Sequence, residues 1–494
     1  MLLILFALPA FAGLLLWLAR PNVKTSRRIA LLISGILIIS AAWLVQQTSQ
    51  GAVQVMAFGG WRPPYGIAFA ADALSSAFIL LQALLLGITF LALRVEQHGE
   101  ETLLRAHPLA LFLTSGLIGG FLTGDLFNLF VMFEAVLISS YLLLQIPGTR
   151  RSLAGALPVI VVNFVASALF LAGLGLLYGM TGSVNLADLS EQLVNAPPNL
   201  RRVALALLVV AFGTKAAIVP LSFWMPASYP TLAAPLAALF AGIMTKLGVY
   251  ALLRIHALIS LDPGLSEALI WAGGASALVG VLAALSQYEM RRLLSFHSVS
   301  QVGYIVAALG LGEPLGLAAA LFFALHHSLV KSSLYLVADE LERRNATRDL
   351  RKMDFRRTGG GLLALCFGVA AFSLAGLPPL SGFFGKLSVF RAAFEAESFV
   401  LLGLLLVASL FTLASMLKIW RFAFARKPAP KKGEFHTQFQ PGALGLLVTL
   451  ILVLGFSAGP VYTYALEAAK ENIDGSKYRE AVFNAMGEGP IGKP

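Results

Sequence analysis

The sequence carries little charge for its length. Asp, Glu, Lys and Arg make up 12% of the 494 residues, against about 25% in soluble domains, and 58% of the residues are hydrophobic. Apolar runs long enough to cross a hydrocarbon core of about 30 Å as helices recur along the whole chain. A water-soluble fold is therefore excluded, and we expect an all-α polytopic membrane protein.

Cysteine and the motifs of nucleotide or metal chemistry are also scarce. The one cysteine, Cys366, lies inside an apolar run and can form no intrachain disulfide, thiolate metal site or Fe–S site. There is no Walker-type Gly-x-x-x-x-Gly-Lys-Ser/Thr motif and no helical His-Glu-x-x-His. We therefore expect no cofactor and no metal, and transport that runs on an existing gradient or on coupling to a partner instead of enzymatic catalysis.

Apolar runs and their polar breaks predict about fourteen membrane spans. The first, within Met1 to Arg20, is expected to remain as a helix instead of being cleaved as a signal peptide. An even number of spans places both termini on one side. The expected spans are 2–19, 28–46, 69–93, 108–123, 126–145, 156–180, 203–230, 234–256, 265–285, 297–312, 315–338, 362–394, 398–420 and 440–465.

The basic residues predict the orientation. The net charge of +11 arises mainly from Lys and Arg in alternate short loops, as in proteins that follow the positive-inside rule, so we do not expect nucleic-acid binding. The loops expected to face the cytoplasm are 20–28, 94–107, 146–155, 224–233, 286–296, 339–360 and 418–440. Both termini are then periplasmic or extracellular, and the protein is expected in the bacterial inner (cell) membrane.

Two of the expected spans are interrupted by proline. Pro220 breaks span 203–230 and Pro378-Pro379 breaks span 362–394, since proline removes a backbone donor and clashes with the preceding turn. Each break alone could be a harmless kink. Pro220-Leu221-Ser222-Phe223, however, resembles Pro379-Leu380-Ser381-Gly382 five spans later. An odd separation inverts the second copy, which predicts two inverted five-helix repeats, each with a broken helix.

This pattern divides the chain into four parts. The expected divisions are 1–107 for the first three helices, 108–256 for the first antiporter-like unit, 265–420 for the second, inverted unit, and 421–494 for the last helix and a short tail.

Several ionisable side chains fall inside expected spans. Charged groups at this depth are costly in lipid, and those that persist usually pair or line an ion path. The candidate proton or ion-translocating residues are Glu134, Lys215, Lys246, His326, His327, Lys331 and Lys386. His327 and Lys331 are four residues apart and share one helix face.

These residue types suit proton transfer. A carboxylate beside a lysine holds it charged, and separating the two prompts the lysine to pass its proton on, while histidine can relay between such groups. We expect a row of these residues in the membrane plane. The alternatives are static: a fixed Glu134–Lys215 pair, a snorkelling Lys246, and packing for one of His326 and His327. Four further residues near span ends are expected in solvated, interfacial positions: Asp72, Asp125, His256 and His297.

Short motifs over roughly residues 60 to 425 carry a family resemblance. They are Gly124-Asp125-Leu126-Phe127-Asn128-Leu129-Phe130, Gly213-Thr214-Lys215, Trp224-Met225-Pro226, Arg291-Arg292-Leu293-Leu294, Ser298-Val299-Ser300-Gln301-Val302-Gly303-Tyr304 and Ala375-Gly376-Leu377-Pro378-Pro379. In these motifs the chain resembles the antiporter-like family shared by respiratory complex I, membrane-bound hydrogenases and Mrp cation/proton antiporters. The medium length and Lys386 are shared by the Mrp branch and one complex I subunit, and the first motif favours the Mrp branch.

The resemblance implies a role for each site residue. Glu134 and Lys215 take the paired-switch positions, Lys246 the central relay, His327 and Lys331 the link, and Lys386 the exit end. It also implies partners, namely the other subunits of a hetero-oligomeric Na+/H+ antiporter, and leaves open whether Na+ or only H+ passes through this chain. One alternative is a proton-pumping subunit of complex I or a membrane-bound hydrogenase. Another is an assembly scaffold with static charges.

Overall fold

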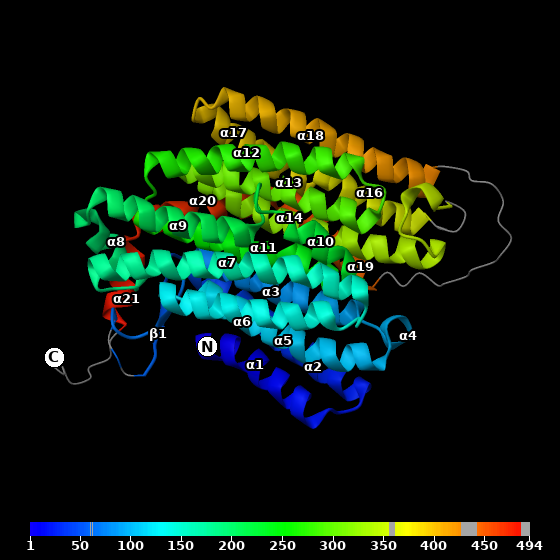
Figure 1. Cartoon of the computed structure of the whole chain (residues 1–494), viewed down its shortest axis with the longest axis horizontal. Coiled ribbons are helices and arrows are strands. Elements are labelled where there is room, and N and C mark those ends of the chain that lie inside the picture. Colours follow the sequence, from blue (N-terminus) through cyan, green and yellow to red (C-terminus); the bar gives the residue numbers. More distant parts are fainter. Residues whose placement is uncertain (60, 62, 355–360, 426–441, 486–494) are drawn as a thin grey trace.

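The computed structural model describes residues 1–59, 61, 63–354, 361–425 and 442–485, and its helices run side by side in one bundle (Figure 1). The helices are α1 (Leu2–Ala19), α2 (Val23–Thr48), α3 (Ala73–Ala92), α4 (Val95–His98), α5 (Glu100–Leu122), α6 (Leu126–Gln145), α7 (Arg150–Thr181), α8 (Leu186–Gln192), α9 (Pro198–Ala216), α10 (Trp224–Ser228), α11 (Ala234–Ile259), α12 (Pro263–Ser286), α13 (Met290–Gly310), α14 (Pro314–Asn345), α16 (Gly361–Ala375), α17 (Ser381–Glu395), α18 (Phe399–Trp420), α19 (Gly442–Phe456), α20 (Ala458–Asp474) and α21 (Ser476–Asn484). Two short antiparallel strands, β1 (Gln54–Ala57) and β2 (Ala68–Ala71), pair with Val55 opposite Ala70.

The described residues contain 11 helices long and apolar enough to cross a membrane, or 12 if α19 and α20, which meet at 76°, form one span. The expected polytopic helical membrane protein is confirmed. The helix axes share one direction in Figure 1, as they do when helices cross a bilayer together.

The centre of the bundle is formed by α11, α13 and α14. In their most apolar stretches, 100% of α11, 94% of α13 and 89% of α14 is buried, whereas the buried share is 33% for α1, α2 and α18. The latter helices lie at opposite edges of the bundle (Figure 1), where large apolar side chains face outward. Polar groups on α11 and α14 are therefore shielded from lipid by the surrounding helices.

Both proline segments interrupt a helix. After α9 the chain turns at Ala217, which has a left-handed φ of 62°, and the Val219 N–H donates to the Ser276 hydroxyl over 2.8 Å. After α16 the chain turns at Gly376, with a φ of 90°, and the Gly382 N–H donates to the Ser373 hydroxyl over 3.3 Å. Other parts of the protein thus satisfy the backbone groups that the breaks release, as burial at membrane depth requires.

The C-terminal segment is more ordered than a short tail. Helix α20 continues to Asp474, and α21 follows it directly. In Figure 1, α21 lies at the end of the bundle that also carries α8 and β1. Asn472 of α20 is 4% exposed and contacts the central helix α11 through Arg254. The described part of the tail therefore covers one end of the bundle.

Candidate functional site

Glu134 and Lys215 meet through a hydroxyl group. Glu134 lies on α6, Ser167 on α7 and Lys215 in the last turn of α9. The Ser167 hydroxyl donates to the Glu134 carboxylate, and the Lys215 ammonium donates to the same hydroxyl oxygen over 3.4 Å. Lys215 also lies 4.8 Å from the ring centroid of Phe133. Lys215 is 4% exposed and Glu134 is half-buried, so this cluster reaches the side of the bundle.

Lys246 and His327 are in direct contact where α11 crosses α14. The Lys246 Nζ lies 2.5 Å from the His327 Nδ1, and both side chains are fully buried. One nitrogen must donate a proton and the other must accept it, so the amine and the imidazole form a hydrogen bond along which a proton can pass. One turn along α14, the Lys331 ammonium donates to the Leu294 carbonyl over 2.9 Å.

His326 faces the opposite way, toward the second helix break. Its Nδ1 lies 2.9 Å from the Ser381 hydroxyl, which is 3.0 Å from the Ser373 hydroxyl. The two adjacent histidines thus contact different elements, and each has a polar partner. His326 connects α14 to α16 and α17, the two arms of the break.

Lys386 on α17 forms the far end of the row. Its ammonium donates to the Ala375 carbonyl over 2.9 Å and to the Ser409 hydroxyl over 2.8 Å. It also lies 5.4 Å from the ring centroid of Tyr304. The seven candidate residues therefore fall into three clusters, around Lys215, Lys246 and Lys386. The contacts that can pass a proton are those through the Ser167 hydroxyl, between Lys246 and His327, and between Lys386 and the Ser409 hydroxyl. Among the described residues, no direct hydrogen bond joins one cluster to the next.

The expectation of solvated, interfacial positions near the span ends is wrong for four residues. Asp72 is 6% exposed, Asp125 5%, His256 9% and His297 0%. Asp125 caps α6 by accepting from the Asn128 N–H over 2.7 Å, and the His297 Nε2 lies 2.8 Å from the Ser415 hydroxyl. Packing of neighbouring elements over the helix ends buries these groups, which hydropathy along a single segment does not reveal.

The buried ion pair between Asp72 and Arg254 was not predicted from the sequence. Arg254 donates to the two carboxylate oxygens over 2.5 and 2.8 Å, and the side chains are 8% and 2% exposed. The available signal was the spacing of Lys246, Tyr250 and Arg254 at intervals of four, which places three polar groups on one face of α11.

No set of three or more His, Cys, Asp or Glu side chains in the described ranges is arranged to hold a metal ion. The groups in the three clusters are hydroxyls, amines, imidazoles and one carboxylate, which suit proton transfer better than metal coordination.

A family model described as NADH:quinone oxidoreductase/Mrp antiporter, TM, matches residues 123–412. The chain belongs to this family. All seven candidate residues lie within the matched segment, as does Arg254, whereas Asp72 lies before it. The family resemblance drawn from the motifs is confirmed.

Two curated relatives match over nearly their whole length. The chain is 38% identical to the D subunit of the Na(+)/H(+) antiporter of Alkalihalophilus pseudofirmus, covering 91% of this chain and 92% of the relative. It is 34% identical to the D subunit of the Na(+)/H(+) antiporter of Bacillus subtilis, covering 96% of this chain and 98% of the relative.

Solved structures show the same fold in different assemblies. A chain of the Mrp complex from Dietzia sp. superposes with a TM-score of 0.91 at 30% identity, covering 98% of this chain and 99% of that one. A chain of an archaeal membrane-bound sulfane sulfur reductase gives 0.91 at 26% identity, covering 97% and 99%. A chain of respiratory complex I from Thermus thermophilus gives 0.77 at 29% identity, covering 94% and 99%.

Proposed function

We propose that this chain is the D-type subunit of a bacterial Mrp-type Na+/H+ antiporter, a secondary transporter component without enzymatic activity of its own. Two relatives named as the D subunits of Na+/H+ antiporters match it over more than nine-tenths of its length, and a chain of an Mrp complex shares its fold. The observation that carries a translocating role is the contact of Lys246 with His327, because it places two proton-binding nitrogens 2.5 Å apart in the buried centre of the bundle.

In this proposal, protons move along the three clusters. Glu134 and Lys215 form a switch whose charges interact through Ser167, Lys246 and His327 form the central relay with Lys331 beside it, and Lys386 forms the exit end. His326 supports a connection from the centre to the second break through Ser381. A static ion-pair role for the lysines fits less well, since the hydrogen-bond partners of Lys246, Lys331 and Lys386 in the described ranges are an imidazole, backbone carbonyls and a hydroxyl, not carboxylates.

The proposed partners are the other Mrp subunits. Glu134 is half-buried on α6, and its neighbours Val131 and Ile138 are 40% and 58% exposed. A carboxylate open to lipid at this depth is costly, which supports a neighbouring subunit covering this side of the bundle.

We further propose about fourteen spans, counting the two interrupted segments α9–α10 and α16–α17 with the uninterrupted helices and the bent pair. Residues 108–256 and 265–420 then form the two inverted five-helix units, between the helices of 1–107 and the segment 421–494. Both termini face the periplasm or the exterior, as the distribution of Lys and Arg favours.

The test is Na+-dependent proton exchange in membrane vesicles that contain the complete complex. Glu134→Ala and Lys215→Ala should each lower the exchange strongly while the complex assembles normally. Lys470→Ala changes an exposed lysine on α20 and serves as the control. Normal exchange in both the Glu134 and the Lys215 variants would refute the proposal.

A second candidate is a proton-pumping, antiporter-like subunit of a respiratory complex. The fold shared with chains of the sulfane sulfur reductase and of complex I favours it. Affinity purification from native membranes distinguishes the two. Redox subunits that oxidise NADH or another donor support the second candidate, whereas small antiporter subunits support the first.

A further inference from the structure

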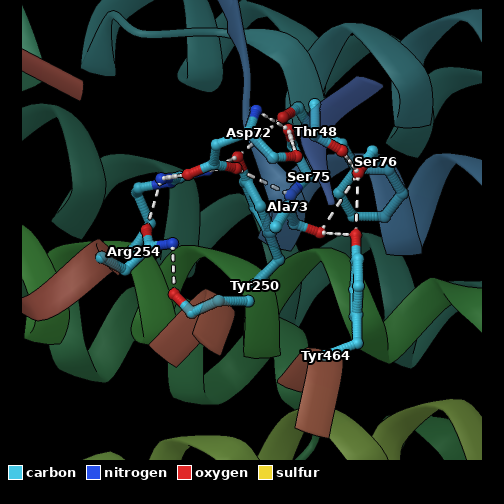
Figure 2. A network of polar contacts seen from close by, with 11 residues as sticks. Thr48, Asp72, Ala73, Ser75, Ser76, Tyr250, Arg254 and Tyr464 are labelled. Atoms are coloured by element: carbon cyan, nitrogen blue, oxygen red, sulfur yellow. Dashed lines mark hydrogen bonds and ion pairs between the residues drawn. The ribbon is translucent and has the colours of Figure 1, made fainter. Parts of the chain in front are cut away.

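Asp72 and Arg254 form an ion pair near the C-terminal end of α11 (Figure 2). Asp72 caps α3 by accepting from the Ser75 N–H over 2.9 Å, and both of its carboxylate oxygens accept from Arg254. This two-point geometry fixes the guanidinium and neutralises its charge. The pair lies at the end of the bundle that the charge distribution assigns to the exterior.

Arg254 lies on the same helix face as the central lysine. Lys246, Tyr250 and Arg254 follow at intervals of four on α11, so each lies about one turn beyond the last. Figure 2 shows Arg254 and Tyr250 side by side at the ion pair. A polar stripe therefore leads from the Lys246–His327 contact toward the outside and ends at the Asp72–Arg254 pair.

Tyr250 blocks this stripe in the observed state. Its hydroxyl donates to the Phe121 carbonyl over 2.6 Å and accepts from Arg254 over 2.9 Å, so its only proton is engaged and one lone pair is occupied. The rings of Phe78 and Phe121 pack against Tyr250, with centroids 5.8 and 5.2 Å away. The hydroxyl is thus tied to Phe121 and Arg254, and its proton points away from the path to Lys246 into the Phe121 carbonyl.

The helices α20 and α21, near the C-terminus, also contact the pair. The Asn472 side-chain oxygen of α20 accepts from Arg254 over 2.6 Å, and the Tyr478 ring of α21 lies 5.1 Å from the guanidinium. The Tyr464 hydroxyl of α20 also donates to the Ala73 carbonyl over 2.6 Å, one residue beyond Asp72 (Figure 2). The pair thus links the N-terminus of α3 to α11, and α20 and α21 pack against it.

We propose that Asp72 and Arg254 form an outer gate that separates Lys246 from the external solution. While the pair is intact, the fixed guanidinium donates to the Tyr250 hydroxyl and holds it in its blocking position. When the two side chains separate, Tyr250 is released and Lys246 gains access to the outside. Both are positioning residues acting through Tyr250. This gate rests on the proposed function, because it presumes that protons reach Lys246.

The alternative is a static strut that only joins the helices. Removing one partner would strand a buried charge and damage the fold in either case, so the informative variant removes both charges. Asp72→Asn with Arg254→Gln keeps a polar side chain at both positions, and asparagine, which has the size of aspartate, can still cap α3. The matched control is Asp262→Asn with Arg202→Gln, which removes an ion pair whose side chains are 27% and 61% exposed.

The measurement is the Na+-independent decay of an imposed pH difference in proteoliposomes containing the purified complex. The gate predicts that the Asp72→Asn/Arg254→Gln complex assembles and loses the pH difference several-fold faster than the wild type or the control. Adding Lys246→Met should abolish the extra leak, because the leak runs through the lysine stripe. A wild-type decay rate overturns the gate, and so does an extra leak that persists without Lys246, since it would report only damaged packing.

If the double variant does not assemble, Tyr250→Phe and Arg254→Lys replace it. The first keeps the ring and removes the blocking hydroxyl, and the second keeps the charge and removes the two-point geometry. The gate predicts a faster, Lys246-dependent decay in both, and a wild-type rate in both overturns it. Because the leak is measured without Na+, these results are separate from the proposed function, whose failure would appear as absent Na+-dependent exchange in the wild-type complex.

Discussion

Individual proton-binding groups in the centre of the bundle differ in what they contact. His327 touches Lys246 directly, whereas His326 touches the Ser381 hydroxyl. A group that exchanges a proton with its neighbour must lie within hydrogen-bonding distance of it. The central relay therefore depends more on His327 than on His326.

Replacing the two histidines separately tests this difference. His327→Ala should lower Na+-dependent exchange by roughly tenfold or more, as expected for loss of a proton-transfer group, while His326→Ala should have a smaller effect. Exchange is measured in vesicles at matched amounts of assembled complex. A larger loss in His326→Ala would contradict the assignment.

Ser167 is the second residue that the geometry singles out. Its hydroxyl is the bridge between Glu134 and Lys215, and a hydrogen bond to a charged group is worth about 1.5–3 kcal/mol. Ser167→Ala should therefore lower exchange by roughly ten- to a hundredfold, and Ser167→Thr, which keeps the hydroxyl, should retain most of it. Equal activity in the two variants would show that the bridge has no part in transport.

At the second break, the backbones of helices α16 and α17 come into close contact. A Cβ on Gly382, at the start of α17, would lie 1.7 Å from the Ser373 carbonyl oxygen of α16 and 2.8 Å from the His326 ring. The two arms of the break can approach each other only because this residue has no side chain. The same approach brings Ser373 and Ser381 to His326.

Alanine at this position should separate the two arms. Gly382→Ala is expected to destabilise the protein by about 1–3 kcal/mol or more, the range seen for overpacking. Gly403→Ala on α18, where a Cβ meets nothing within 4 Å, should be neutral or slightly stabilising. The melting temperature of the purified complex measures both, and similar values for the two variants would contradict the tight contact.

For the molecule as a whole, orientation in the membrane determines which end of the bundle each solution reaches. Helix α21 and strand β1 lie at one end of the bundle, and the loop before α7 lies at the other (Figure 1). Arg254 contacts Tyr478 of α21, so the proposed gate lies at the end that carries α21 and β1. In the proposed orientation, the gate end faces the exterior.

Cysteine labelling tests this orientation. In a Cys366→Ala background, which removes the only native cysteine, Glu480→Cys on α21 should react with an impermeant thiol reagent applied to intact cells. Glu101→Cys on α5 should react only in inside-out vesicles. Both positions are exposed. The reverse pattern would place the termini in the cytoplasm and the gate on the inner side.

The sequence alone determined the membrane class, the two breaks, the family and the burial of the candidate lysines and histidines, but not that of Asp72, Asp125, His256 and His297. The membrane class, the breaks and the intramembrane charges follow from the order of residues along one segment: a long apolar run, a proline within it, or a charge at its centre. The family follows from short motifs spread along the chain.

Only the tertiary structure decided which groups meet. The hydroxyl between Glu134 and Lys215, the choice of His327 as the partner of Lys246, and the pairing of Asp72 with Arg254, 182 residues apart, all depend on how each helix is rotated and how deep it lies against its neighbours. Periodicity identifies the polar face of a single helix, but packing between helices selects what that face contacts.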